Sequence, residues 1–131
     1  MSVSPSQSLI LIVDDFDDAL EIYQQYLTFK GYRVIVAHSG AEALTMARTQ
    51  RPAMIFMDLR MPHMTGTDAL HALRADPTFQ QVPIVALTAQ VLDHERAAAL
   101  EAGFAEVISK PCNPDDLILV VERLAQRESR P

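Results

Sequence analysis

The segment MIFMDLRMPHMTG, from Met54 to Gly66, indicates how this chain folds. It begins with a short apolar run, places Asp58 at the end of that run, and continues with a proline and a glycine. An apolar run that ends in turn residues is typical of a strand covered on both faces in a parallel sheet. Aspartates are common where strands enter loops, so Asp58 alone does not indicate a function.

Similar apolar runs recur along the chain, and helical patterns separate them. The expected strands are Leu9–Val13, Arg33–Ala37, Met54–Met57, Val82–Leu87 and Glu106–Ser109. The expected helices begin after Asp17, at a capping box from Ser39 to Glu42, near Thr65, near Val91 and at Asn113. Strict alternation of strands and helices implies right-handed crossovers. We therefore predict an α/β fold with a doubly wound parallel sheet.

Length, composition and charge limit the possible functions. The chain has 131 residues, 49% of them hydrophobic, which fits one domain with a real core. The formal charge of −6 and the lack of a basic stripe argue against direct nucleic-acid binding. The single cysteine, Cys112, excludes an intrachain disulfide and suits a reducing compartment.

No run approaches the ~20 apolar residues that a membrane-spanning helix needs, and the first residues lack the pattern of a signal peptide. We expect a cytoplasmic protein with no membrane contact. Residues 9–127 are expected to form one domain between two tails, 1–8 and 128–131.

Polar side chains stand at the carboxyl ends of the expected strands. Asp14 and Asp15 follow the first strand, Asp58 the third, Thr88 the fourth and Lys110 the fifth. Because the carboxyl ends of parallel strands meet at one edge of the sheet, we expect these side chains to converge. Each has a simpler interpretation, such as an acid near a helix N-terminus or a surface lysine, but their coincidence at one edge favours a site.

The predicted cluster suits phosphoryl chemistry. Three carboxylates in one place repel each other, and a divalent cation relieves that repulsion. Oxygen ligands of this kind favour Mg²⁺, which keeps several waters and often bridges to phosphate. Lys110 offers a positive charge to a phosphoryl oxygen, and Thr88 offers a hydroxyl donor. Asp58 is then a nucleophile that forms an aspartyl phosphate.

Four short motifs, in this order and spacing, resemble the receiver domain of two-component response regulators. They are VDD at 13–15, MDLRMPHMTG at 57–66, ALTA at 86–89 and SKP at 109–111. The resemblance extends from about Leu9 to Leu124 and implies a flavodoxin-like three-layer sandwich with five helices and the strand order 2-1-3-4-5. It also suggests a stand-alone receiver, although an excised domain of a longer protein remains open.

The resemblance implies a role for each site residue. Asp58 takes a phosphoryl group from a histidine kinase or a histidine phosphotransfer protein, with Mg²⁺ as the cofactor. Asp15, Asp58 and the backbone carbonyl of Arg60 would ligate Mg²⁺ directly, and Asp14 would act through water. Thr88 and Lys110 would bind the phosphoryl oxygens beside the small Ala89. The peptide bond before Pro111 is expected to be cis. Such a protein catalyses only its own phosphorylation and dephosphorylation, so it is not expected to be an enzyme with a separate substrate.

One position departs from the family pattern. Receivers usually carry an aromatic residue three positions before the lysine, and this chain has Val107. A valine has no ring to move with Thr88, so we expect Val107 to pack in the core and signalling to depend on motion of the loop after Thr88 and of the fourth helix. The face formed by the fourth helix, fifth strand and fifth helix is expected to bind a downstream protein. Homodimerisation on phosphorylation is left open, as are the cognate kinase and the lifetime of the phosphoryl group.

Two other functions remain open. A phosphatase of the haloacid dehalogenase type needs a nucleophile on the first strand in a DxD arrangement, and Asp15-Phe16-Asp17 has that spacing. However, the chain is too short for a cap domain, and this function leaves Asp58 without a role. A pseudo-receiver that binds partners without phosphorylation fits Val107 but leaves Asp58, Thr88 and Lys110 without a purpose.

Overall fold

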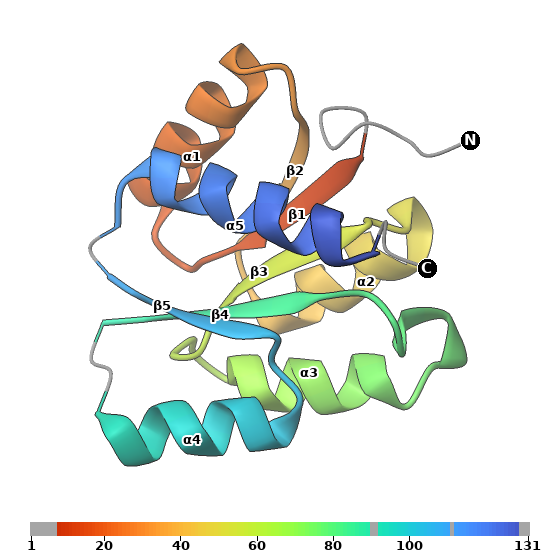
Figure 1. Ribbon diagram of the computed structural model, residues 1–131. Helices are drawn as coiled ribbons and strands as arrows, with labels where there is room; N and C mark the ends of the chain where they lie inside the picture. The colour runs from red at the N-terminus through yellow and green to blue at the C-terminus, as the bar shows by residue number, and fades with distance from the viewer. Residues whose placement is uncertain (1–7, 90–91, 111, 129–131) are drawn as a thin grey trace.

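The computed structural model describes residues 8–89, 92–110 and 112–128. Strands and helices alternate along the chain (Figure 1). In order, they are β1 (Leu9–Val13), α1 (Asp17–Phe29), β2 (Arg33–Ala37), α2 (Gly40–Gln50), β3 (Met54–Asp58), α3 (Gly66–Arg74), the short 3-10 helix η2 (Pro77–Phe79), β4 (Ile84–Thr88), α4 (Asp93–Ala102), β5 (Glu106–Ser109) and α5 (Pro114–Glu128).

The five strands form one parallel sheet in the order β2-β1-β3-β4-β5. The predicted fold class and strand order are therefore confirmed. Three strand boundaries differ from the prediction, and one of them is the end of β4, which lies at Thr88 instead of Leu87. β3 extends to Asp58, and β4 begins at Ile84 because Val82 still belongs to the preceding turn, where its N–H donates to the carbonyl of Phe79 at 3.3 Å.

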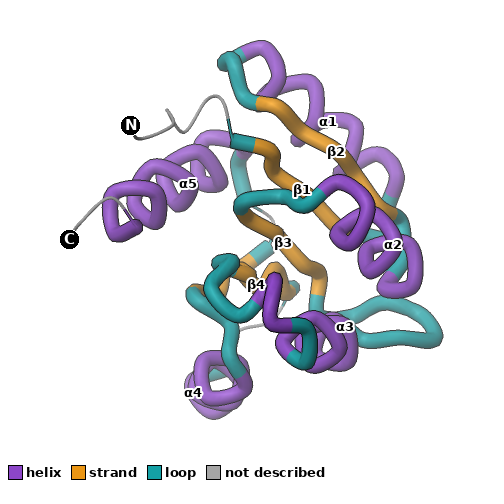
Figure 2. Tube along the Cα trace, turned by 90° about the vertical axis from the view of Figure 1, so that its right-hand side faces the viewer, coloured by secondary structure: helices purple, strands orange, loops and turns teal. Residues whose placement is uncertain are grey.

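Helices cover both faces of the sheet, as Figures 1 and 2 show. Side chains alternate between the two faces along each strand. In β1, Ile10 and Ile12 belong to the core that α1 and α5 cover, whereas Leu11 and Val13 belong to the core that α2, α3 and α4 cover. All four side chains are fully buried, which explains why this strand is apolar at every position. The result is a three-layer sandwich with two separate cores.

Several helix ends match the sequence signals. α1 ends in a Schellman motif, in which the N–H of Gly31 donates to Thr28 and that of Tyr32 donates to Leu27, and Gly31 has a φ of 98°. At α2, Ser39 accepts from the N–H of Glu42, as half of the predicted capping box. The complete capping box of the chain's described helices lies at α3, between Thr65 and Asp68, and the sequence interpretation missed it.

Arg74, at the end of α3, joins three segments of the chain. Its guanidinium donates to the carbonyl of Phe79, to that of Val82 at 2.8 Å and to that of Gly103 at 3.2 Å. Burial lowers the pKa of this guanidinium from its ordinary value. Arg74 therefore connects the end of α3 to the η2 turn and to the turn between α4 and β5.

Replacing Arg74 with methionine is expected to lower the free energy of unfolding by about 1–3 kcal/mol, because three carbonyl groups lose a donor while the side-chain volume is kept. Urea denaturation followed by circular dichroism measures the change. Arg48, exposed on α2, provides the control, and its change to methionine is expected to stay within about 0.5 kcal/mol. Equal effects of the two substitutions would contradict this role of Arg74.

Candidate functional site

The carboxyl edge of the sheet brings the predicted residues together. Asp14 directly follows β1, and its N–H donates to the carbonyl of Ala37 at 3.2 Å, which continues the pairing with β2. Asp58 and Thr88 are the last residues of β3 and β4. Lys110 directly follows β5, and its N–H donates to the carbonyl of Thr88 at 2.7 Å. Because all strands run in the same direction, these residues lie at the same edge.

Three carboxylates gather at this edge. One oxygen from each of Asp14, Asp15 and Asp58 lies within 4.8 Å of the others. Asp14 is fully buried, Asp58 is 5% exposed and Asp15 is exposed to solvent. The predicted convergence of these acids is therefore confirmed. Such a concentration of negative charge favours a bound cation.

Lys110 partly neutralises the cluster. Its Nζ lies 2.7 Å from Oδ2 of Asp14 and 3.4 Å from Oδ2 of Asp58. Burial alone would lower the pKa of Lys110, but the hydrogen bond and charge of Asp14, together with the charge of Asp58, raise it above its ordinary value. Lys110 is therefore a fixed cation that bridges two buried carboxylates.

Burial raises the pKa of Asp58 above its ordinary value, and the charge of Asp14 adds to this effect. The N–H of Arg60 and the ammonium of Lys110 act in the opposite direction but do not cancel it. This direction agrees with the distances, because Lys110 is closer to Asp14 than to Asp58. Ionised Asp58 therefore lacks full compensation from the protein, and a metal ion can supply it.

Main-chain donors fix the orientation of both buried acids. Oδ1 of Asp14 accepts from the N–H of Phe16 at 3.0 Å, and Oδ1 of Asp58 accepts from the N–H of Arg60 at 3.0 Å. Each carboxylate thus uses Oδ1 for a hydrogen bond to the amide two residues later and turns Oδ2 toward Lys110. This arrangement holds the acids in place before any ligand binds.

The chain passes very close to itself at Gly66. The N–H of Gly66 donates to the carbonyl of Leu59 at 3.1 Å, so the start of α3 lies against the end of β3. A Cβ atom at this position would overlap the main-chain oxygen of Asp58 and lie 3.0 Å from the Cα of Leu59. Glycine is therefore required here for space.

We expect Gly66→Ala to cost about 1–3 kcal/mol of stability, as overpacking against main-chain atoms does. The same change should weaken Mg²⁺ binding, because it shifts the main chain that carries Asp58. Thermal melts with and without Mg²⁺ measure both effects. Gly40→Ala is the matched control, because the atoms nearest to an added Cβ there belong to the side chain of Met64, at 2.8 to 2.9 Å, and not to the main chain. A smaller loss for Gly66→Ala than for Gly40→Ala would show that the close approach is unimportant.

The remaining predicted residues lie as follows. Thr88 is 3% exposed, whereas Ala89 and the side chain of Arg60 are exposed. Val107 is buried in the core on the α4 side of the sheet, as expected for a packing residue. Pro111, the candidate for a cis peptide, lies outside the described residues.

Sequence reasoning assigned Lys110 to phosphoryl oxygens and missed that Asp14 is its nearer partner. The shared position of both residues at strand ends was the available signal.

The donor set at this edge fits Mg²⁺. Carboxylate oxygens are the ligands that this ion prefers, and the cluster contains three of them around one partly neutralising ammonium. The exposed carboxylate of Asp15 leaves a side of the cluster accessible for an ion that retains waters.

Comparison with known proteins agrees with this arrangement. Residues 10–122 match the family model described as the response regulator receiver domain. Response regulator MprA of Mycobacterium avium is 36% identical over 118 residues, and a 14.6 kDa protein in the sodA1 3′ region of Leptolyngbya boryana is 34% identical over 118 residues. The chain belongs to the response regulator receiver domain family. The alignment covers 90% of this chain and 90% of the Leptolyngbya protein, but only 51% of MprA.

Solved structures of receivers have the same fold. The chemotaxis response regulator CheY4 of Vibrio cholerae aligns with a TM-score of 0.85 and 30% identity, over 90% of this chain and 98% of that one. The receiver domain of the sensor histidine kinase PA1611 from Pseudomonas aeruginosa aligns with a TM-score of 0.83 and 32% identity, over 92% and 98% of the two chains. In that structure a magnesium ion is coordinated in the active site cleft. In the described part of the present chain, every helix is too short or too polar to cross a membrane.

Proposed function

We propose that this protein is the phosphoacceptor of a two-component phosphorelay, and that Asp58 receives the phosphoryl group in a Mg²⁺-dependent reaction. The donor is the phosphohistidine of a histidine kinase or of a histidine phosphotransfer protein. One observation carries the proposal: the ammonium of Lys110 lies 2.7 Å and 3.4 Å from two buried carboxylates, within a cluster of three. This combination of acids and a fixed cation suits the transfer of a charged phosphoryl group.

Asp58 is the nucleophile in this proposal. A carboxylate oxygen of Asp58 forms a bond to phosphorus while the bond between phosphorus and the donor imidazole breaks, and the imidazole leaves after taking up a proton. The hydrogen bond from the N–H of Arg60 to Oδ1 keeps the carboxylate oriented toward the donor. The short side chain of Ala89, which is exposed at the rim, leaves room for the donor to approach.

The other residues bind charge. Mg²⁺ held by Asp15, Asp58 and the main-chain carbonyl of Arg60, with Asp14 acting through water, would neutralise negative charge on the phosphoryl oxygens. Lys110 and Thr88 would hold the remaining phosphoryl oxygens through an ammonium and a hydroxyl. Lys110 exchanges part of its contact with Asp14 for the phosphoryl group, so it stays paired in both states.

The output is a change in protein–protein contacts. Phosphorylation would shift a two-state equilibrium and change the affinity of the face formed by α4, β5 and α5 for a downstream protein. In this role the protein acts in the cytoplasm and turns over only its own phosphoryl group.

Incubation with acetyl phosphate, with and without Mg²⁺, tests this function by intact mass. We expect a mass increase of one phosphoryl group that requires Mg²⁺ and does not form when EDTA is added before acetyl phosphate. Absence of the adduct under both conditions would contradict the proposal and favour a pseudo-receiver. Steady hydrolysis of acetyl phosphate that survives Asp58→Asn but is lost in Asp15→Asn would instead indicate a phosphatase.

A further inference from the structure

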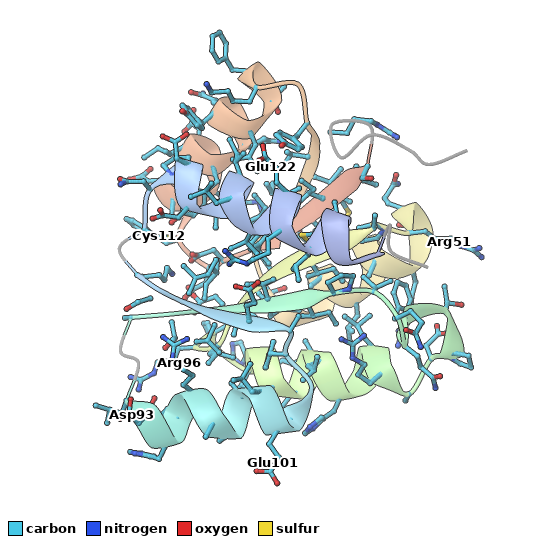
Figure 3. All side chains as sticks on the ribbon, in the orientation of Figure 1. Arg51, Asp93, Arg96, Glu101, Cys112 and Glu122 are labelled. Carbon is cyan, nitrogen blue, oxygen red and sulfur yellow. The ribbon has the colours of Figure 1, made fainter. Side chains whose placement is uncertain are left out.

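A single arginine connects α4 to the edge of the sheet. Nη1 of Arg96, in α4, donates to the main-chain carbonyl of Val107, in β5, at 3.1 Å. Figure 3 shows Arg96 between this helix and the strand. Among the described residues, this is the one hydrogen bond that joins α4 to β5.

The carbonyl of Val107 needs a donor because β5 is an edge strand. The N–H of Lys110 donates to Thr88 in the neighbouring strand. Main-chain groups of alternate residues point to the same side of a strand, so those of residues 106, 108 and 110 point toward β4 and the carbonyl of Val107 points to the free edge. Arg96 therefore pairs a group that the sheet itself leaves unpaired.

The contact also connects two of the strand ends that carry site residues, the end of β4 at Thr88 and the end of β5 before Lys110. Arg96 lies in the first turn of α4, where its N–H donates to the carbonyl of Leu92 at 2.9 Å, and this helix follows Thr88 along the chain. Val107 lies three residues before Lys110. The chain from Thr88 through α4, across the Arg96 bond and along β5 to Lys110 thus forms a closed path between two site residues.

A second arginine binds β5 from the other helix layer. Nε of Arg123, in α5, donates to a carboxylate oxygen of Glu106 at 2.9 Å, and its terminal nitrogen contacts the other oxygen. That contact joins two side chains and does not involve α4. Only the contact of Arg96 therefore depends on where α4 lies relative to the strand.

We propose that the Arg96–Val107 hydrogen bond is a latch that holds α4 in its unphosphorylated position and opens when Asp58 carries a phosphoryl group. The inference rests on the proposed function. A phosphoryl group at Asp58 would bind both Thr88 and Lys110, which are the two ends of the path that the latch closes.

Linkage gives the expected effect. If the latch exists only in the unphosphorylated state, its loss destabilises that state and leaves the other unchanged. Removal of the arginine should then raise the affinity for a phosphoryl mimic by roughly 2- to 10-fold, which is the worth of one hydrogen bond. A purely structural contact would lower the melting temperature without changing this affinity.

Titration of beryllium fluoride in the presence of Mg²⁺, followed by amide NMR, tests the latch. Arg96→Ala and the bulkier Arg96→Met, which both lack a donor, should bind the mimic more tightly than the wild type, while Arg123→Ala should bind it equally. The amide of Ile108 shares a peptide group with the carbonyl of Val107. Its resonance in free Arg96→Ala should therefore shift in the same direction as that of the wild type on binding the mimic.

The outcomes separate the latch from the function. Equal affinity in the wild type and both Arg96 variants would overturn the latch and leave the proposed function intact. An equal gain in Arg123→Ala would also overturn it, because any loosening of β5 would then suffice. If beryllium fluoride fails to bind the wild type, the proposed function falls and the latch falls with it.

Discussion

Asp58→Asn is expected to abolish phosphoryl acceptance completely and, at the same time, to stabilise the Mg²⁺-free protein by about 1–3 kcal/mol, the usual cost of a buried polar group that lacks full compensation. The amide keeps the shape of the side chain and can still accept from the N–H of Arg60. It lacks the charge that burial and Asp14 disfavour. The residue that performs the chemistry thus lowers the stability of the fold.

The sign of the pH dependence follows from the raised pKa of Asp58. Just above the ordinary value of 3.8, the folded protein keeps a proton on Asp58 that the unfolded chain has lost. The stability contributed by this group therefore falls as pH rises through that window and remains lower at neutral pH. The advantage of Asp58→Asn should accordingly be largest near pH 7 and should vanish at acidic pH.

Urea denaturation at several pH values, with and without Mg²⁺, measures these effects. In the wild type, Mg²⁺ at ten times its dissociation constant should add about 1.4 kcal/mol, and this gain should disappear in Asp58→Asn. Asp93→Asn, at an exposed acid of α4 outside the cluster, is the control and should keep the full Mg²⁺ response. An unchanged Mg²⁺ response in Asp58→Asn would remove this residue from the metal site.

Lys110→Met should be the most destabilising change at the site, with a loss of about 3–5 kcal/mol, because it leaves the fully buried carboxylate of Asp14 without its cation. Phosphoryl acceptance should fall by roughly 10²- to 10³-fold, since one charge that faces the reacting group is lost. The stability lost should be partly recovered on addition of Mg²⁺.

In the wild type the pKa of Lys110 is raised, so Lys110 contributes fully to the free energy of unfolding below its ordinary pKa of 10.5. This contribution is lost as pH rises through the higher pKa of the folded state. Lys110→Met should lack this loss of stability at high pH. Lys30→Met, at the chain's other and exposed lysine, is the matched control and should change stability by no more than about 0.5 kcal/mol. A Lys110→Met variant as stable as this control would contradict the buried pair.

The fold could be predicted because its determinants are local in sequence. Continuous apolar runs in β1 and β3 require two covered faces, and the helices between them supply the covers. Strand ends were less predictable, since they depend on hydrogen bonds to other segments. Val82 pairs with the η2 turn, and the N–H of Leu59 donates to Leu87 at 2.9 Å, which carries the pairing of β3 past Asp58.

The site was predictable at the level of residues but not of contacts. Strand-end positions were enough to place Asp14, Asp58 and Lys110 at one edge, because parallel strands share a direction. The preference of Lys110 for Asp14, and the reach of Arg96 to a main-chain carbonyl, depend on side-chain conformations across separate elements. No spacing in the sequence encodes those distances.

The central claim is that folding places Asp58 as the one nucleophile in a site completed by a metal ion and Lys110. The most direct measurement treats the wild type with acetyl phosphate and Mg²⁺, reduces the product with borohydride, and locates the resulting homoserine by peptide fragmentation. The account predicts homoserine at position 58 alone. Homoserine at position 14 or 15, or none at any aspartate, would contradict it.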